Sequence, residues 1–403
     1  MKKILFVINT LGLGGAEKAL LELLNRLNKQ GYDLSLLVLL NQGELVRDIP
    51  QGTKLLNKKF DYTAIHSPKG LKRVKLTAIK KLFSNFSGIR LAGYIISNYI
   101  DMKKRGISKA ENLLWRAVAM GSPKLSDEYD LAVSFIEGGS AYYVSDYVKA
   151  KKKACFIHID YESAGYGKKL DKDCFEKFDK VFPISEGVRQ SFLNVYPEYK
   201  EKTFVFENLV DLEGIEAKSR LAEGFEDDFD GMRILSMGRL NAQKSYDMSV
   251  DAMKILIDKG YKVRWYILGE GDQRELLANK IAELNLKDDF ILLGNKENPY
   301  PYLKQCDIYS HATKYEGKSI AVQEAKMLRC PIILTNTPGN LEQITDGYDG
   351  LLCEFNPQSL AEKLERYINN PSMAKEMGEK ARESFLASLH DEENIAQFTS
   401  MLL

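Results

Sequence analysis

Apolar residues follow two alternating patterns along this chain. Residues 3–8 form a short continuous apolar run, residues 16–27 carry leucines at helical spacing, and residues 34–40 form a second apolar run. A buried strand, an amphipathic helix and another buried strand in this order predict a βαβ unit with a parallel sheet.

The same order returns in the second half. An apolar run at 233–237 leads into a helical pattern at 247–258 and a further apolar run at 263–268. Later short runs predict more strands alternating with helices, at 290–293, 308–310, 331–335 and 350–353. The pattern is helical from residue 359 to the end, with a break at 369–371.

The domain boundary is predicted near residues 211–231, which are acidic, lack an apolar period and resemble a linker. We expect an α/β protein with two Rossmann-like domains, over residues 1–210 and 211–385. A final helix over 386–403 is expected to pack back toward the first domain.

Composition narrows the class of protein. The chain has 403 residues, 44% of them hydrophobic, with 57 lysines and arginines against 56 acids, so it is not expected to clamp nucleic acid along its length. Its five cysteines stand singly, which favours a reduced cytoplasmic protein and predicts no metal site. The apolar run at 3–8 is too short for a signal peptide or a membrane span.

Positive charge is concentrated in residues 54–124, with 16 basic residues against 3 acids. Aromatic and aliphatic residues are interleaved with these lysines and arginines. We interpret the segment as a surface for an anionic membrane, consistent with a protein peripheral to the inner face of the cell membrane. The alternative is an ordinary helical excursion with a solvated basic face; no RNA-binding signature accompanies it.

Two motifs carry candidate chemistry in the C-terminal half. Arg239 and Lys244, after the run at 233–237, combine a planar fork with a compact charge and suit a pyrophosphate without a metal. Glu316, at or just before a helix start, and Glu324, two turns later, could accept hydrogen bonds from sugar hydroxyls. Each motif alone is weak, since either could be a solvated surface, but together they are unlikely to be coincidence.

These residues form the patterns GR-x4-K and E-x7-E (YEGKSIAVQE), which accompany GLGGAEK near the N-terminus and FIHIDY in the middle of the chain. In order and spacing they resemble the retaining glycosyltransferases of family 4. The resemblance implies the GT-B architecture, in which two Rossmann-like domains face each other across a cleft. It also implies a nucleotide-sugar donor, most commonly UDP-linked, and no metal or other cofactor.

The resemblance assigns a role to each matching residue of the second half. Arg239 and Lys244 would hold the diphosphate, Glu324 the ribose, and Glu316 the transferred sugar. Further donor contacts are expected at the backbone amides of Gly317, Lys318 and Ser319, and around the base at Gly269, Glu270, Gly271 and the turn 294–296, including Lys296.

In the first half, Gly14 and Gly15 would let the first helix approach the donor phosphate. His158 matches the family's strand-end histidine near the donor sugar and the acceptor. Glu137 is a further candidate, although it could equally hydrogen-bond a turn. The remaining histidines, His66, His311 and His390, have no comparable context.

The reaction implied is sugar transfer to a hydroxyl of a glycan or lipid-linked acceptor, in synthesis of a bacterial-type surface polysaccharide or glycolipid. Asp228 and Asp230 spell a DxD motif, but no apolar strand precedes them and we interpret them as solvated. A nucleotide-dependent oxidoreductase is a weaker alternative, because Glu17 replaces the last glycine of its fingerprint. An epimerase or phosphorylase on the same scaffold, or a non-catalytic membrane adaptor, remains open.

Overall fold

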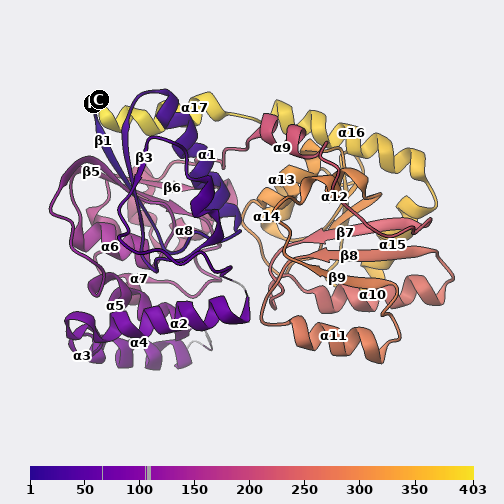
Figure 1. Ribbon diagram of the computed structural model, residues 1–403, viewed down its shortest axis with the longest axis horizontal. Coiled ribbons are helices and arrows are strands. Elements are labelled where there is room, and N and C mark those ends of the chain that lie inside the picture. The colour runs from indigo at the N-terminus through magenta and orange to yellow at the C-terminus, as the bar shows by residue number, and fades with distance from the viewer. Residues whose placement is uncertain (66, 105, 107–109) are drawn as a thin grey trace. The chain divides into compact units, whose positions relative to one another are not determined.

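Each half of the chain folds around its own parallel sheet (Figure 1). The computed structural model describes residues 1–65, 67–104, 106 and 110–403. Five positions of the basic segment, His66 among them, therefore lie outside the described residues. Unit 1 comprises Met1–Leu209 and His390–Leu403, and unit 2 comprises Val210–Leu389.

The sheet of unit 1 has six parallel strands in the order β3-β2-β1-β4-β5-β6. In chain order they are β1 Lys3–Ile8, β2 Asp33–Val38, β3 Thr53–Leu55, β4 Glu128–Ser134, β5 Lys149–Ile157 and β6 Lys180–Pro183. Ile4 in β1 pairs with Leu34 on one side and Leu131 on the other. The chain order therefore reverses at β1, as in a doubly wound fold.

The helices of unit 1 lie between these strands and at the chain end. They are α1 Gly15–Lys29, α2 Pro68–Phe83, α3 Ser87–Arg90, α4 Ala92–Lys104, α5 Trp115–Met120, α6 Gly139–Tyr147, α7 Lys168–Asp171, α8 Glu186–Val195 and α17 Asp391–Thr399. The predicted first strand and helix are present, and α1 buries Leu20, Leu23, Leu24 and Leu27 at helical spacing.

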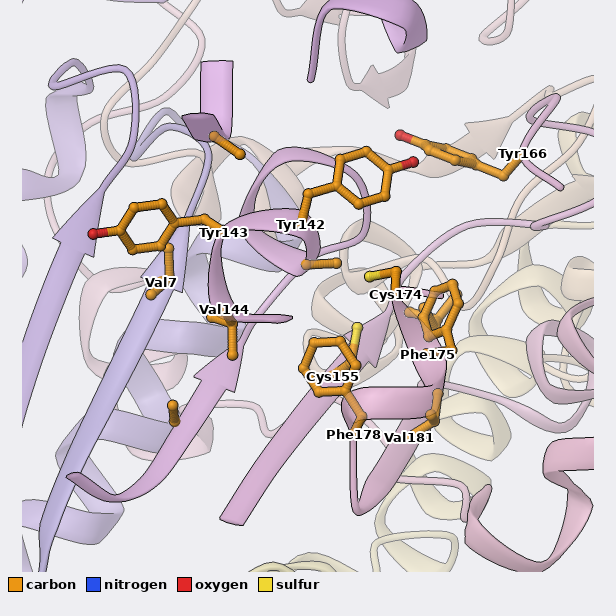
Figure 2. Close-up of a cluster of buried hydrophobic side chains, with 14 of the residues drawn as sticks. Val7, Tyr142, Tyr143, Val144, Cys155, Tyr166, Cys174, Phe175, Phe178 and Val181 are labelled. Carbon is orange, nitrogen blue, oxygen red and sulfur yellow. The ribbon is translucent and has the colours of Figure 1, made fainter. Parts of the chain in front are cut away.

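A large core fills one face of this sheet (Figure 2). Figure 2 shows Val7 of β1 beside Tyr143 of α6, and Cys155 and Val181 near Cys174 and Phe175 in the segment after α7. Asp171 is completely buried beside this core. Its carboxylate accepts hydrogen bonds of 2.7–2.8 Å from the hydroxyls of Tyr142, Tyr161 and Tyr196. These three donors compensate the burial of a carboxylate.

The C-terminal helix α17 belongs to unit 1 and covers the opposite face of the sheet (Figure 1). The ring of Phe398 stacks on Phe6 of β1, with centroids 6.1 Å apart. Asp391 forms an ion pair of 3.5 Å with Arg26 of α1. Within the last segment, the expected start at residue 386 falls inside the preceding helix, which runs to Ala387.

The sheet of unit 2 also has six parallel strands, in the order β12-β11-β10-β7-β8-β9. They are β7 Met232–Met237, β8 Val263–Leu268, β9 Phe290–Gly294, β10 Ile308–His311, β11 Ile332–Thr335 and β12 Leu351–Cys353. All six had been predicted, with bounds that differ by one residue at most. Because β7 is the first strand of the unit and lies between β8 and β10, the chain order reverses there as it does at β1.

Helices cover both faces of this second sheet. They are α9 Leu212–Lys218, α10 Tyr246–Asp258, α11 Arg274–Glu283, α12 Tyr300–Gln305, α13 Ile320–Met327, α14 Pro338–Leu341, α15 Pro357–Ile368 and α16 Pro371–Ala387. Residues of α10, α11 and α15 pack with Ile234 and Trp265 on one face. Residues of α9, α12, α13 and α16 pack with Leu235 and Tyr266 on the other.

The segment predicted as an acidic linker is more ordered than its composition suggested. It contains α9, and its Asp227 carboxylate contacts Arg233, Arg264 and the hydroxyl of Tyr266. These partners lower the pKa of Asp227 to about 2 against the opposing effect of burial. This acidic segment directly follows the division between the units at Leu209 and Val210, and long-range partners fix it although it lacks an apolar period.

The basic segment folds as helices α2 to α5, which Figure 1 shows gathered on one side of unit 1. Large apolar side chains on these helices and on the turn at Ser84–Phe86 are exposed, among them Leu76, Ile79, Phe83, Phe86, Ile89, Ile96, Tyr99 and Ile100. Lysines and arginines lie between them in the sequence. Within the described residues, no helix is both long enough and apolar enough to cross a membrane.

Candidate active site

The topology of unit 2 predicts where a ligand binds. In an open parallel sheet, the loops at the carboxyl ends of the two strands flanking the point of reversal diverge and leave a crevice. Here those strands are β7 and β10, and the loops that follow them span residues 238–245 and 312–319. Arg239, Lys244 and Glu316, predicted from the sequence, all lie on these two loops.

Closely packed glycines hold the loops at this edge of the sheet. A Cβ on Gly269 would lie 1.9 Å from the carbonyl oxygen of Gly238, and one on Gly271 would lie 2.2 Å from that of Leu240. Gly238 and Gly269 both have positive φ, at 147° and 158°. The predicted glycines Gly269 and Gly271 therefore allow the loops after β7 and β8 to touch through their backbones.

The loops after β7 and β10 are joined by main-chain and side-chain hydrogen bonds. The backbone N–H of Lys314 donates to the carbonyl of Gln243, and the Gln243 side-chain amide donates to the carbonyl of Tyr315, both at 2.9 Å. On the other side, Gly339 of α14 packs so closely that a Cβ would lie 2.0 Å from the carbonyl oxygen of Gly317. These contacts fix the backbone around Glu316.

Lys244, Glu316 and His311 form a compact charged cluster. The Lys244 Nζ lies 2.5 Å from Glu316 Oε2 and 3.2 Å from His311 Nε2, and His311 Nε2 lies 3.2 Å from the same carboxylate oxygen. The side chains of Lys244 and Glu316 are 13% and 15% exposed, and that of His311 is 2% exposed. The Tyr309 hydroxyl lies 3.3 Å from His311 Nδ1 on the buried side.

The charges in this cluster follow from its pKa shifts. Burial alone would raise the pKa of Glu316, but the Lys244 ammonium and the hydrogen bond with His311 outweigh it and hold that pKa well below its usual range. Burial and the neighbouring Lys244 lower the pKa of His311 to about 4. At neutral pH Glu316 is therefore ionised and the imidazole of His311 is neutral.

His311 is the residue that sequence reasoning missed. It was set aside as a histidine without context, whereas it ends β10 and contacts both Lys244 and Glu316. The available signal was its position after the apolar run at 308–310. Because that run pairs directly with β7, the residue that follows it, His311, lies beside the loop that carries Lys244.

The other predicted donor residues surround this cluster with different exposure. Arg239 is exposed, and among the described residues it has no ion-pair partner. Lys296 follows β9 and lies 5.7 Å from the ring centre of Tyr302. Lys318 and Ser319 lead into α13, whose N-terminal capping position is Ser319. Glu316 thus lies in the loop, three residues before the cap.

Glu324 lies inside α13 and is 3% exposed. Its Oε1 accepts a hydrogen bond of 3.0 Å from the hydroxyl of Tyr300, the first residue of α12. Burial and the adjacent Glu324 carboxylate raise the pKa of Tyr300, so its hydroxyl remains a donor. This hydrogen bond fixes the orientation of one carboxylate oxygen.

In unit 1 the loops after β1 and β4, which flank the point of reversal, are also joined by hydrogen bonds. The side-chain amide of Asn9, just after β1, donates to the carbonyl of Glu137 at 3.3 Å, and its oxygen accepts from the N–H of Ser140 at 2.8 Å. Gly14 caps α1, and a Cβ there would lie 2.2 Å from the Glu17 carboxylate. Gly15 is exposed at the first position of α1.

Glu137 and His158 meet at the ends of β4 and β5. The Glu137 carboxylate is buried and accepts a 2.9 Å hydrogen bond from the backbone N–H of His158. Burial raises the pKa of Glu137 to about 7 and lowers that of His158 to about 3, so the imidazole is neutral. The His158 Nε2 is buried and has no hydrogen-bond partner among the described residues.

Among the residues that the structure describes, no group of three or more His, Cys, Asp or Glu side chains could hold a metal ion. Asp230 of the DxD sequence is 77% exposed and pairs with Lys262.

Comparisons with known proteins agree with this geometry. Residues 225–384 match the family model described as "Glycosyl transferases group 1", and this region contains the predicted donor residues. Among solved structures, a Staphylococcus aureus TarM variant in complex with fondaparinux, α-GlcNAc-glycerol and UDP aligns over 100% of both chains, with a TM-score of 0.69 and 15% identity. This chain has the GT-B fold.

Two curated proteins match part of the chain. The N-acetylgalactosamine-N,N'-diacetylbacillosaminyl-diphospho-undecaprenol 4-alpha-N-acetylgalactosaminyltransferase of Campylobacter jejuni is 30% identical over 52% of this chain and 56% of its own length. The poly(ribitol-phosphate) alpha-N-acetylglucosaminyltransferase of S. aureus is 24% identical over 60% of this chain and 48% of its own length. The chain thus matches about half the length of these relatives.

Proposed function

We propose that this GT-B protein is a retaining glycosyltransferase of family 4 that moves a sugar from a nucleoside-diphosphate donor, with UDP as its nucleotide, to a glycan or lipid-linked hydroxyl. The observation that carries the proposal is the cluster of Lys244, Glu316 and His311 at the carboxyl ends of β7 and β10. It lies within the region that matches group 1 glycosyl transferases.

In this proposal Arg239 and Lys244 bind the diphosphate. Negative charge grows on the diphosphate as the bond to the sugar breaks, so cations placed at the phosphates stabilise the transition state more than the bound substrate. An ammonium has three N–H donors, so Lys244 can keep its contact with Glu316 while it also donates to a phosphate oxygen. Arg239 is exposed and free to form a bidentate contact.

Glu316 then accepts hydrogen bonds from hydroxyls of the transferred sugar. Its carboxylate stays ionised because Lys244 and His311 hold its pKa low, and an ionised carboxylate is a strong acceptor for hydroxyl donors. Glu324 binds the ribose diol through its carboxylate, whose Oε1 is oriented by the hydroxyl of Tyr300. The glycine loops at 269–271 and the turn at 294–296 border the base, and the amides of 317–319 lie beside the sugar.

The acceptor hydroxyl is proposed to bind at unit 1, near His158 and Glu137. In the retaining reaction it attacks the anomeric carbon from the face that the diphosphate leaves, and a phosphate oxygen of the leaving group takes its proton. His158 is neutral, with a buried Nε2 that can accept a hydrogen bond. This supports a role in positioning the sugar or the acceptor rather than a cationic role.

We also propose that the protein works without a metal, in the cytoplasm and at the inner face of a membrane. The exposed apolar side chains of α2 to α4, interleaved with lysines, support attachment to an anionic lipid surface. One of the two curated relatives is named for a diphospho-undecaprenol and the other for a poly(ribitol-phosphate). These names support a role in surface polysaccharide or glycolipid synthesis.

A non-catalytic membrane adaptor on the same scaffold is the alternative from another class. An adaptor that binds no donor would not need the cluster formed by Lys244, Glu316 and His311. Burying charged groups costs free energy through the loss of hydration, and such clusters are found most often at functional sites. An epimerase or phosphorylase is distinguished by its product.

The test is a thermal-shift panel of nucleoside diphosphates in EDTA, followed by transfer from the matching nucleotide sugar. A nucleotide at 100 times its dissociation constant should stabilise the protein by about 2.7 kcal/mol. Lys244→Met should remove both the shift and turnover, while Lys287→Met, at an exposed lysine of the same unit, should change neither. NMR of the product should show the donor's anomeric configuration. An inverted product, or a free nucleotide without transfer to any acceptor tried, would contradict the proposal.

A further inference from the structure

A pocket of about 440 Å³ lies in unit 1 between the end of α2 and the loop after α5. It is lined by Asn41, Thr77, Lys80, Lys81, Ser84, Gly121, Ser122, Pro123 and Lys124. The lining thus presents three ammonium groups, three hydroxyls and one amide, and none of its residues is acidic. This chemistry suits an anion with several oxygen acceptors.

The floor of the pocket is built by close packing. Gly121 ends α5 so near to α2 that a Cβ there would lie 2.1 Å from the carbonyl oxygen of Lys81. The Lys81 side chain is buried and its Nζ donates a 2.9 Å hydrogen bond to Ser122 Oγ, which in turn donates to the carbonyl of Val118 at 2.7 Å. Lys81 and Ser122 are therefore held in place before any ligand binds.

The rim of the pocket adds positioned charge. Lys124 Nζ lies over the ring of Tyr147, 3.3 Å from its centre. Lys80, which precedes Lys81 in α2, is exposed. Burial lowers the pKa of Lys81 to about 8, and burial together with Arg90 lowers that of Lys124. An anion bound between these amines would offset the cost of holding them charged side by side.

We propose that this pocket binds a phosphate group. Phosphate oxygens accept hydrogen bonds from lysine ammonium and serine or threonine hydroxyl groups, both of which the pocket supplies. The volume lies in the range of small-ligand sites and exceeds what a single phosphate fills, so the phosphate can belong to a larger molecule. The proposal does not rest on the donor site, which belongs to unit 2.

Two sources can supply this phosphate, a lipid headgroup or a soluble phosphate compound. The apolar side chains next to the pocket on α2 are exposed, with Leu76 at 47%, Ile79 at 46% and Phe83 at 77%. They form one stripe at helical spacing, and Lys80 lies between this stripe and the pocket-lining side of the helix. A headgroup phosphate in the pocket would place acyl chains beside the stripe.

The test uses two pocket variants and one control. Lys81→Met removes the buried ammonium at similar length, and the pair Lys80→Gln/Lys124→Gln removes the two rim charges. The pair Lys149→Gln/Lys200→Gln removes two exposed charges elsewhere in unit 1 and keeps the same net charge. Thermal melting reports whether each variant folds; if Lys81→Met is unstable, the rim pair decides alone, since both its lysines are exposed.

Each protein is titrated with inorganic diphosphate at constant ionic strength, and floated with vesicles of equimolar phosphatidylglycerol and phosphatidylcholine or of phosphatidylcholine alone. If a lipid supplies the phosphate, the rim pair loses affinity for the anionic vesicles on the order of thirtyfold and the control pair far less. If a soluble compound supplies it, wild type has a saturable diphosphate site in addition to the one proposed at Arg239 and Lys244, and both pocket variants lack this additional site. Equal behaviour of the pocket variants and the control pair in both titrations would overturn the proposal.

Discussion

Replacing Lys244 by methionine should destabilise unit 2 in a pH-dependent way. The substitution removes the ammonium that lies 2.5 Å from Glu316 Oε2 and leaves a carboxylate in a site where burial opposes its charge. Removing one partner of a buried ion pair costs about 3–5 kcal/mol. Because Lys244 and Glu316 remain 13% and 15% exposed, we expect about 3 kcal/mol, at the lower end of that range.

The sign of the pH dependence follows from the pKa of Glu316. In the wild type this pKa lies below its unfolded value, so the contribution of Glu316 to stability is present above the unfolded pKa and is lost only as pH falls through the folded one. Without Lys244, burial raises the pKa instead, and the folded state takes up a proton. The loss of stability should therefore be smaller near pH 5 than near pH 8.

Urea denaturation followed by tryptophan fluorescence can resolve this effect. The chain has two tryptophans, and Trp265 is fully buried in the core of unit 2. In a Trp115→Phe background, fluorescence reports unit 2 alone. The double variant Lys244→Met/Glu316→Gln is the control, because removing both charges should recover most of the loss. A single variant as stable as the wild type near pH 8, or a double variant no more stable than the single one, would refute the reasoning.

Other substitutions test the remaining buried groups. Glu137→Gln should raise the free energy of unfolding by about 3 kcal/mol near pH 8, where the buried carboxylate with its pKa of about 7 is ionised, and by little near pH 5; urea titrations giving equal gains at both values would contradict this. Asp171→Asn should lower it by about 2–3 kcal/mol, since an amide cannot accept from all three tyrosine hydroxyls; an unchanged denaturation midpoint would argue against that network. Glu324→Gln should weaken UDP binding about tenfold but leave 2′,3′-dideoxy-UDP binding unchanged in calorimetry. Equal weakening for both nucleotides would rule out the ribose contact.

The strands β1 and β2 and those of unit 2 were predictable because they lie within parallel sheets and are largely buried. Such strands are near-continuous apolar runs bounded by polar turns, and the run at 263–268 coincides with β8. The helix at 247–258 was found with one residue missing, since α10 starts at Tyr246. Both are local signals, carried by neighbouring residues.

What the sequence did not reveal depends on contacts between distant segments. His311 meets Lys244 across 67 positions, and only the pairing of β7 with β10 brings them together. Asp227 is fixed by Arg264, 37 positions away. Lys81 and Ser122 are separated by 41 positions and meet because Gly121 lets two helices touch. The spacing of apolar residues along the chain does not predict such long-range contacts.

The binding of the diphosphate by Arg239 and Lys244 is tested most directly by calorimetry of UDP and of uridine in EDTA. We predict that wild type prefers UDP over uridine by about a hundredfold or more, because two charged contacts each contribute about 1.5–3 kcal/mol. The variant Arg239→Gln/Lys244→Met should bind the two ligands almost equally. A variant that keeps the wild-type preference for UDP, or a wild type that binds UDP only when magnesium or manganese is added, would contradict the assignment.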